Sequence, residues 1–251
     1  MAKLYFHYSA MNAGKSTLLL QASYNYQERG MRTAAFTAAL DDRAGVGRIA
    51  SRLGLGADAA LFTVDTDLFA AVQALMRREP LHCVFIDEAQ FLSEDQVWQL
   101  ARVADRLGVP VMCYGLRTDF RGELFPGSKA LLAIGDELRE VRTICKCGRK
   151  ATMVVRLGPN GKALLEGDQV AIGGEDRYVS LCRRHWEEEM GRVPPEDLVG
   201  FTAGGPSIRV VYSFSILAGS RFRPVAFRAL RGFNETARNC VNRHESEPTR
   251  G

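Results

Sequence analysis

The sequence lacks any apolar stretch near the roughly 18–20 residues that a membrane-spanning helix requires. Its first residues, MAKLYFHYSAMNAGKS, have only a short apolar part and do not form the apolar core of a secretory signal peptide. The chain has only six cysteines, and without a secretion signal a disulfide framework is a poor interpretation. These absences predict a cytoplasmic protein with no membrane partner. Its hydrophobic fraction of 46% is enough for a buried core.

A basic excess is also missing from most of the chain. Nine of the 33 basic and five of the 29 acidic residues lie from Arg192 onward, so residues 1–191 hold 24 of each. A nucleic-acid-binding domain is expected to carry a basic excess on its folded part. The sequence therefore gives no support for a nucleic-acid partner.

The segment 192–251 differs in composition from the rest, because it contains arginine but no lysine. Apart from a short apolar run at 208–217, it lacks the patterning that a core requires. We expect a poorly ordered tail that is dispensable for activity. Two origins remain open: an out-of-frame or fused reading of the gene end, or a basic arm that contacts anionic partners or a neighbouring subunit.

Residues 1–144 alternate short apolar runs with longer amphipathic stretches, which predicts a parallel α/β sheet covered on both faces. The expected strands are 3–8, 33–38, 81–87, 109–114 and 138–145, and the expected helices are 15–29, 66–77, 93–107 and 127–134. Ser93 is the expected N-cap of the third helix. The glycine-rich segment 41–56 is expected to be a mobile loop.

The pattern changes at residue 145, where a small β-rich module begins and continues to residue 191. Asn160-Gly161 predicts a hairpin that joins strands at 153–157 and 163–165. Short β segments at 169–172 and 177–180 and a helix at 182–190 follow. The module has too little apolar content to be stable alone, so we expect an additional staple.

A phosphate-binding loop is expected between the first strand and the first helix. The sequence Ser9-Ala10-Met11-Asn12-Ala13-Gly14-Lys15-Ser16 matches G-x-x-x-x-G-K-[ST] except that Ser9 replaces the first glycine. Backbone N–H groups at a helix N-terminus bind phosphate oxygens, and Gly14 permits close approach. Lys15 would contact the β- and γ-phosphates, and Ser16 would bind Mg²⁺. The loop predicts ATP with Mg²⁺ as the ligand.

Two carboxylates follow the apolar strand 81–87. Asp87 is placed to hold the Mg²⁺ shell, and Glu88 could activate an alcohol in a kinase or a water in an ATPase. The structural alternatives are a solvated carboxylate at the strand end for Asp87 and a helix cap or surface residue for Glu88.

Four of the remaining side chains have the spacing of a zinc site. Cys145-x-Cys147 and Cys182-x-x-His185 provide two ligand pairs separated by 34 residues, which suits tetrahedral Zn²⁺. A site with four protein ligands staples the module and performs no chemistry. The alternative is three unrelated cysteines and a surface histidine. Cys83 and Cys113 lie in apolar runs and are expected to be buried small hydrophobes.

Taken together, these motifs resemble the zinc-containing type II thymidine kinases of bacteria and of animal cytosol. The resemblance covers about residues 1–190 and is carried by MNAGKST, DEAQF, YGLRTDFRGELF, CKCGRKA, IGGEDRYVS and CRRH. Ser9-Ala10 stands where many members have Gly-Pro, and one residue instead of two separates the first cysteines. The resemblance implies a parallel-sheet P-loop (RecA-like) α/β domain at 1–144 and a zinc-stapled lasso module at 145–191.

The resemblance implies ATP-dependent phosphorylation of the thymidine 5′-hydroxyl, giving dTMP and ADP, by a homotetramer. Glu88 would be the general base, and Arg43 would approach the transferred phosphoryl group. Gln90, in the same motif as Asp87 and Glu88, belongs to the expected nucleotide site. The residues expected to wall the thymine base are Met11, Phe91, Leu116 and Phe120, and the expected lasso contacts are Ala171, Ile172, Gly173, Gly174 and Tyr178. Ordinary loop, turn or core roles remain the alternatives for Arg43, the two glycines and the aromatic residues.

Two other function classes remain open. One is a P-loop ATPase motor or switch with a zinc ribbon, which the neutral charge of residues 1–191 disfavours if its partner is nucleic acid. The other is a non-catalytic zinc-binding interaction module, which the intact Lys15, Ser16, Asp87 and Glu88 disfavour.

Overall fold

A computed structural model of the chain describes residues 1–41, 45–170 and 177–192. The chain divides into two units, Met1–Thr202 and Ala203–Gly251, and every residue described below belongs to the first unit. Arg43, the lasso residues 171–174 and the expected disordered tail lie outside the described residues. None of the helices in the described ranges is long and apolar enough to cross a membrane.

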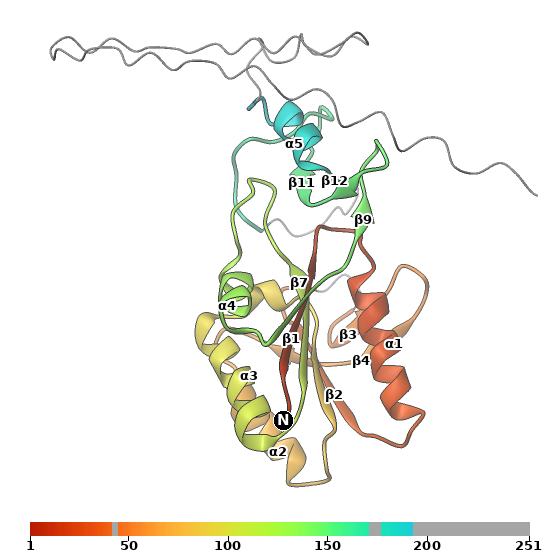
Figure 1. Cartoon of the computed structure of the whole chain (residues 1–251), viewed down its shortest axis with the longest axis vertical. Coiled ribbons are helices and arrows are strands. Elements are labelled where there is room, and N and C mark those ends of the chain that lie inside the picture. Colours follow the sequence, from red (N-terminus) through yellow and green to blue (C-terminus); the bar gives the residue numbers. More distant parts are fainter. Residues whose placement is uncertain (42–44, 171–176, 193–251) are drawn as a thin grey trace, which may run out of the picture. The chain divides into compact units, whose positions relative to one another are not determined.

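The core of the fold is a six-stranded sheet in which every neighbouring pair of strands is parallel (Figure 1). In spatial order the strands are β5 (Ala60–Phe62), β2 (Thr33–Ala38), β6 (Cys83–Ile86), β7 (Val111–Leu116), β1 (Leu4–Ser9) and β8 (Glu137–Glu140). The central strand β6 is buried along its whole length, as its unbroken apolar sequence predicted. The predicted parallel α/β sheet is therefore confirmed.

Helices cover both faces of this sheet (Figure 1). Helix α1 (Lys15–Gln27) lies on one face, and α2 (Leu68–Met76), α3 (Glu94–Leu107) and α4 (Pro126–Ile134) lie on the other. Each face has its own hydrophobic cluster. Ser93 caps α3 as expected, since its side chain accepts from the Gln96 N–H while the Gln96 side chain accepts from the Ser93 N–H.

The expectation that residues 41–56 are only a loop is wrong for the described part of that segment. Strands β3 (Arg48–Ala50) and β4 (Gly56–Asp58) form a short antiparallel hairpin. Ile49 is 2% exposed and packs against Leu19 and Leu20 of α1, which anchors the hairpin to the sheet domain. A single buried apolar residue among glycines and arginines leaves no periodic pattern, so the hairpin escaped prediction.

The chain after β8 contains two pairs of antiparallel strands and one short helix within its described residues. Strands β9 (Thr143–Ile144) and β10 (Lys150–Ala151) pair with each other, β11 (Met153–Arg156) pairs with β12 (Tyr178–Leu181), and α5 (Arg183–Glu189) follows. The predicted strand 138–145 is therefore divided between β8 and β9. The module has its own hydrophobic cluster, which includes Val155, Leu181 and Trp186.

The predicted hairpin of 153–157 with 163–165 is confirmed at its turn and at its first strand, but the pairing of its two arms is much shorter than expected. Asn160 and Gly161 do form the expected turn, with Gly161 at φ 72°, but a single bridge between Leu157 and Ala163 is all that pairs there. The partner of β11 is instead the distant β12, because that pairing brings Leu181 and the metal-binding pair after it into the module core.

Candidate active site

The carboxyl ends of the parallel strands meet at one edge of the sheet, where a cavity of about 740 Å³ opens. The loop after β1, the carboxylates after β6 and the last residue of β7 all face it. Its lining residues are Met11, Asn12, Ala13, Gly14, Lys15, Ser16, Thr17, Asp41, Arg48, Ile49, Ala50, Ser51, Arg52, Leu53, Asp87, Glu88 and Leu116.

The phosphate loop holds its lysine in place before any ligand binds. Lys15 is 9% exposed, and its Nζ donates to Ser9 Oγ at 3.1 Å and to the Ala10 carbonyl at 3.4 Å. Ser9, which replaces the usual glycine, therefore positions the cation. Gly14 has φ 82° and precedes α1, whose N-cap residue makes no side-chain hydrogen bond, and the N-terminus of a helix favours an anion.

Ser16 and Asp87 meet across the cavity in an arrangement that fits Mg²⁺. Ser16 Oγ donates to Asp87 Oδ2 at 3.1 Å, and among the described residues no group hydrogen-bonds to the buried Asp87 Oδ1. Burial, and next the charge of Glu88, raise the pKa of Asp87 to about 7. A divalent cation would offset both effects, and hard oxygen donors are the ligands that Mg²⁺ prefers.

Glu88 is fixed by Gln90 and by its own backbone. It lies in the left-handed region at φ 51° and precedes the short helix η1 (Ala89–Phe91). Gln90, only 1% exposed, donates from Nε2 to Glu88 Oε2 and accepts through Oε1 from the Leu116 N–H at 3.0 Å. A Cβ at Gly115 would lie 2.9 Å from Gln90 N and Oε1. Gln90 therefore contacts Glu88 and Leu116 and is not part of the cavity lining.

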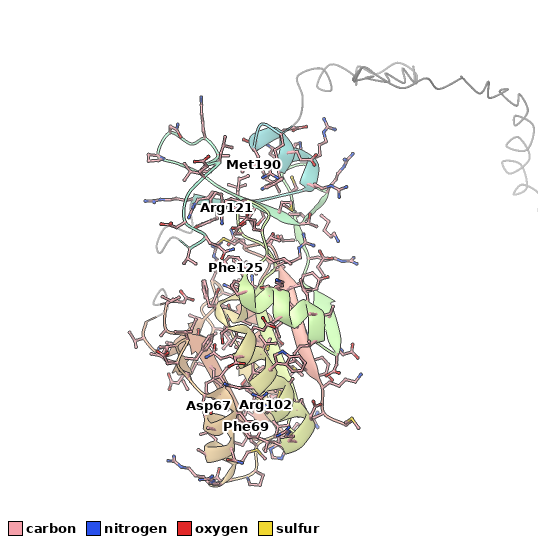
Figure 2. All side chains as sticks on the ribbon, turned by 90° about the vertical axis from the view of Figure 1, so that its left-hand side faces the viewer. Asp67, Phe69, Arg102, Arg121, Phe125 and Met190 are labelled. Atoms are coloured by element: carbon pink, nitrogen blue, oxygen red, sulfur yellow. The ribbon has the colours of Figure 1, made fainter. Side chains whose placement is uncertain are left out.

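The structure separates the residues expected at the thymine base into two groups. Met11 and Leu116 line the cavity, whereas Phe91 and Phe120 do not. Phe91 packs edge-on against Phe125, with ring centroids 6.0 Å apart. Phe125 lies at the start of α4, where Figure 2 labels it. Phe125 was not among the predicted residues, because its place next to Phe91 depends on the contact between η1 and α4.

Phe120 and Tyr178 lie where the sheet domain meets the small module. Phe120 is 2% exposed, and the guanidinium carbon of Arg156 lies 3.9 Å from its ring centroid. Tyr178 is half-buried at the start of β12, opposite Arg156. The buried Arg156 was also missed by the sequence analysis, since nothing local distinguishes it from a surface arginine.

The β3–β4 hairpin adds a wall to the cavity that the sequence analysis missed. Arg48, Ser51, Arg52 and Leu53 face the same space as the phosphate loop. The hydroxyl of Ser51 is buried and has no hydrogen-bond partner in the described part of the chain. Arg48 and Arg52 were the available signal, because they offer positive charge near an expected triphosphate.

The four predicted metal ligands come together in the small module. Their ligand atoms all lie within 4.8 Å of one another. Cys145 Sγ lies 3.2 Å from His185 Nδ1, Cys182 Sγ lies 3.5 Å from the same atom, and the Cys147 and Cys182 sulfurs are 3.9 Å apart. A tetrahedral zinc with bonds of about 2.0–2.3 Å requires separations of roughly 3.5–3.8 Å. The four residues therefore fit Zn²⁺.

Local structure and electrostatics also favour a metal at this site. Gly148 at φ 79° makes the turn after the first pair, and its N–H donates to the Cys145 carbonyl. Burial raises the pKa of Cys145, but the N–H groups of Cys147 and Cys182 and the His185 ring outweigh it and lower that pKa to about 6. The thiolate is the form that binds a metal. Glu188 Oε2 lies 3.8 Å from His185 Nε2, where it can orient the ring.

Several hydrogen bonds join this module to the sheet domain, among them those of Trp186 to Phe120, of Arg117 and of Ser180. Trp186 Nε1 donates to the carbonyls of Phe120 and Val154, each at 3.0 Å. Arg117 Nη2 donates to the Thr152 carbonyl at 3.0 Å. Ser180 Oγ donates to the carbonyl of Met11, in the phosphate loop, at 2.6 Å. The module is therefore attached at the edge of the sheet where the cavity lies.

Comparisons with known proteins agree over the same part of the chain. A family model described as thymidine kinase matches residues 2–186. The thymidine kinase of Jannaschia sp. (strain CCS1) is 67% identical over 194 residues, which are 77% of this chain and 100% of that protein. The thymidine kinase of Agrobacterium fabrum is 70% identical over 188 residues, with 75% and 97% covered. That of Vibrio cholerae is 62% identical over 192 residues, with 76% and 100% covered.

A solved structure, the Pif1 helicase of Candida albicans, aligns with a TM-score of 0.33 and 17% identity over 56% of this chain and 36% of its own. That likeness is too low to support a conclusion. The family match and the relatives, in contrast, cover the sheet, the phosphate loop and the Cys/His cluster together. On that evidence the chain belongs to the thymidine kinase family.

Proposed function

We propose that this protein transfers the γ-phosphoryl group of ATP to the 5′-hydroxyl of thymidine, giving dTMP and ADP. The observation that carries the proposal is that Glu88 faces the same cavity as the phosphate loop. Identity of 62–70% to thymidine kinases over nearly their whole length supports the same activity and disfavours a motor or switch.

The phosphates of ATP bind in the loop 9–16, against the N–H groups at the start of α1. Lys15, already directed by Ser9, places its charge at the β- and γ-phosphates. Ser16 and Asp87 would hold Mg²⁺, which would neutralise charge on the phosphoryl oxygens. Arg43 approaches the transferred group in this proposal, on the strength of the family resemblance.

Glu88 accepts the proton of the thymidine 5′-hydroxyl as that oxygen bonds to the γ-phosphorus and the bond from phosphorus to the β-phosphate oxygen breaks. Its carboxylate must point at the nucleophile, and the hydrogen bond from Gln90 restricts its rotation. Gln90 is in turn held by the Leu116 N–H, next to Gly115. We therefore assign Gln90 to positioning the base rather than to contacting ATP.

Thymidine carries no charge, so the protein must recognise it by shape and by hydrogen bonds. Met11 and Leu116, which line the cavity, provide apolar surface for the base. The family resemblance, and not the cavity lining, supports a place in the pocket for the remaining predicted contacts, which are Phe91, Phe120, Tyr178 and the lasso residues 171–174. Zinc at Cys145, Cys147, Cys182 and His185 fixes the end of the lasso, because β12 leads directly into Cys182.

The chain is accordingly proposed to comprise a sheet domain at 1–144, a zinc-binding lasso module at 145–191 and an additional segment at 192–251. The separate hydrophobic clusters of the first two parts support this division. A homotetramer in the cytoplasm, with no nucleic-acid or membrane partner, completes the proposal. The family resemblance supports the tetramer, and the balanced charge of residues 1–191 supports the absence of a nucleic-acid partner.

The decisive experiment is a phosphorylation screen over the nucleosides with zinc-loaded protein, in which ADP release and nucleoside monophosphate are both measured. We expect ADP release to require thymidine and to match dTMP formation mole for mole. ATP hydrolysis that proceeds equally without nucleoside would contradict the proposal and favour the ATPase alternative.

A further inference from the structure

A side chain of the lasso module holds the backbone of the phosphate loop. Ser180 Oγ donates to the Met11 carbonyl at 2.6 Å, although the two residues are 169 positions apart in the sequence. Met11 and the residues after it line the cavity proposed for ATP. The contact therefore joins the loop to a strand from the other end of the described chain.

The consequence for the loop follows from peptide geometry. In a planar trans peptide the carbonyl and the next N–H point in opposite directions. A hydrogen bond that draws the Met11 carbonyl toward Ser180 therefore turns the Asn12 N–H away from Ser180. Asn12 lines the cavity and has φ 61°, a left-handed conformation that costs a non-glycine residue free energy unless its surroundings hold it.

The position of Ser180 is itself set by the lasso module. Its strand β12 pairs with β11, and Ser180 lies opposite Val154. The next residue, Leu181, is 1% exposed in the module core, and the one after that is the metal ligand Cys182. The strand pairing and core of the module therefore fix the position of Ser180, and the hydrogen bond to Met11 depends on that position.

We propose that Ser180 is a positioning residue for the phosphate loop, through which the zinc-stapled module sets the affinity for nucleotide. The ligand named here, magnesium nucleotide, rests on the proposed function. Because coupling between two binding events is reciprocal, nucleotide in the loop also restrains β12, whose first residue is Tyr178 at the end of the lasso. The two substrates are then coupled through one hydrogen bond.

The test measures binding of Mg-ADP by calorimetry to the zinc-loaded full chain without thymidine. Ser180→Val and Ser180→Thr form an isosteric pair that differs in the hydroxyl, and both are favoured in a strand. We expect Ser180→Val to weaken Mg-ADP binding roughly 3- to 10-fold, the scale of one hydrogen bond, and Ser180→Thr to stay close to the wild type. Val179→Ala, an exposed truncation on the same strand, is the matched control and should change nothing.

Zinc content and the thermal midpoint are measured on each variant, and Ser180→Ala provides a smaller substitution if the valine disturbs β12. Wild-type affinity in both hydroxyl-free variants would overturn the proposal. Equal weakening in Ser180→Thr or in Val179→Ala would also overturn it, because the hydroxyl would then not be the cause. Mg-ADP binding does not require thymidine turnover, so this result is independent of whether the proposed kinase activity is found.

Discussion

Two residues with unusual backbone conformations face the same cavity. Asn12 and Glu88 are the non-glycine residues with positive φ among those the structure describes, at 61° and 51°. Such conformations cost on the order of 1–3 kcal/mol each and persist where surrounding contacts impose them. Here the contacts are the Ser180 hydroxyl for the loop and Gln90 for the carboxylate. Rigidity at the site is therefore built from single hydrogen bonds to identifiable residues.

The clearest prediction at the residue scale concerns Glu88. Glu88→Gln should lower kcat roughly 10²-fold or more, because the amide cannot accept the proton of the 5′-hydroxyl. Binding of ATP and thymidine should stay nearly unchanged, since the side chain keeps its shape. Steady-state kinetics together with calorimetric binding checks both points, and the exposed Glu79→Gln is the control. Wild-type turnover in Glu88→Gln would remove this residue from the mechanism.

A second prediction concerns Gly115, which does not line the cavity. Gly115→Ala places a Cβ 2.9 Å from Gln90 N and Oε1, so Gln90 must move and Glu88 loses its restraint. We expect kcat to fall about 10-fold, with a smaller change in KM, because orientation of the base is lost while the cavity remains. Gln90→Met removes the same hydrogen bonds. If Gly115→Ala acts through Gln90, the double variant should have the same kcat as Gln90→Met alone. Fully additive losses of kcat would show that Gly115 does not act through Gln90.

A third prediction concerns the pH dependence of stability through His7. Its ring stacks on Tyr114 with centroids 4.4 Å apart, and burial, then the charge of Arg139, lower its pKa from 6.5 to about 4. Between pH 6.5 and 4 the unfolded chain binds a proton that the folded chain does not. This contribution to stability is therefore complete above pH 6.5 and is lost as the pH falls toward 4.

His7→Phe should flatten the stability profile over that range while it preserves the stacking. The measurement is the denaturant midpoint at several values between pH 4 and 7, with the exposed His82→Phe as control. An unchanged slope in His7→Phe would show that other groups cause the loss.

At the scale of elements, patterns that are local in sequence were predicted and long-range pairings were not. The apolar run of β6 and the capping sequence at Ser93 are complete within a few residues, so each could be assigned alone. The pairing of β11 with β12 spans more than twenty residues and depends on the core around Trp186. No local pattern specifies such a partner, which is why the turn at Asn160 and the strand before it were predicted correctly but the partner of that strand was not.

The candidate site divides in the same way. The phosphate loop and the Cys/His ligands are short motifs whose chemistry requires particular residue types, and the structure brings each set together. The hairpin wall with Ser51 and the contact of Phe91 with Phe125 depend on how separate elements pack. Contacts between elements that are distant in the sequence follow from the fold and produce no local sequence motif.

The prediction at the scale of elements concerns the zinc site of the lasso module. Cys182→Ser should lose zinc and raise the KM for thymidine, while far-UV circular dichroism shows the sheet domain still folded, because the module has a separate core. Metal analysis and kinetics provide the readouts. Lys146→Ala, between the two cysteines of the first pair, is the control. Full zinc occupancy after all four ligands are replaced would rule out this metal site.

At the scale of the whole molecule, the family relationship accounts for about three quarters of the chain. The family model ends at residue 186, and 194 aligned residues cover all of the Jannaschia relative. Arg192 contacts both the module and the sheet domain, since it lies over the Trp186 ring at 4.6 Å and donates to the Arg121 carbonyl at 3.5 Å. Every residue assigned here to catalysis, nucleotide or zinc lies before this point.

Truncation after Arg192 tests the remaining segment. We expect the shortened protein to keep thymidine phosphorylation, zinc content and oligomer size, because it retains the cavity, the metal ligands and the Arg192 contacts. The alternative is that the eight arginines after Arg192 form a basic arm that binds an anionic partner or a neighbouring subunit. Kinetic assays, metal analysis and sedimentation on both forms distinguish the two. Loss of activity or a smaller oligomer after truncation would establish that the segment is functional and that the kinase requires more than its family core.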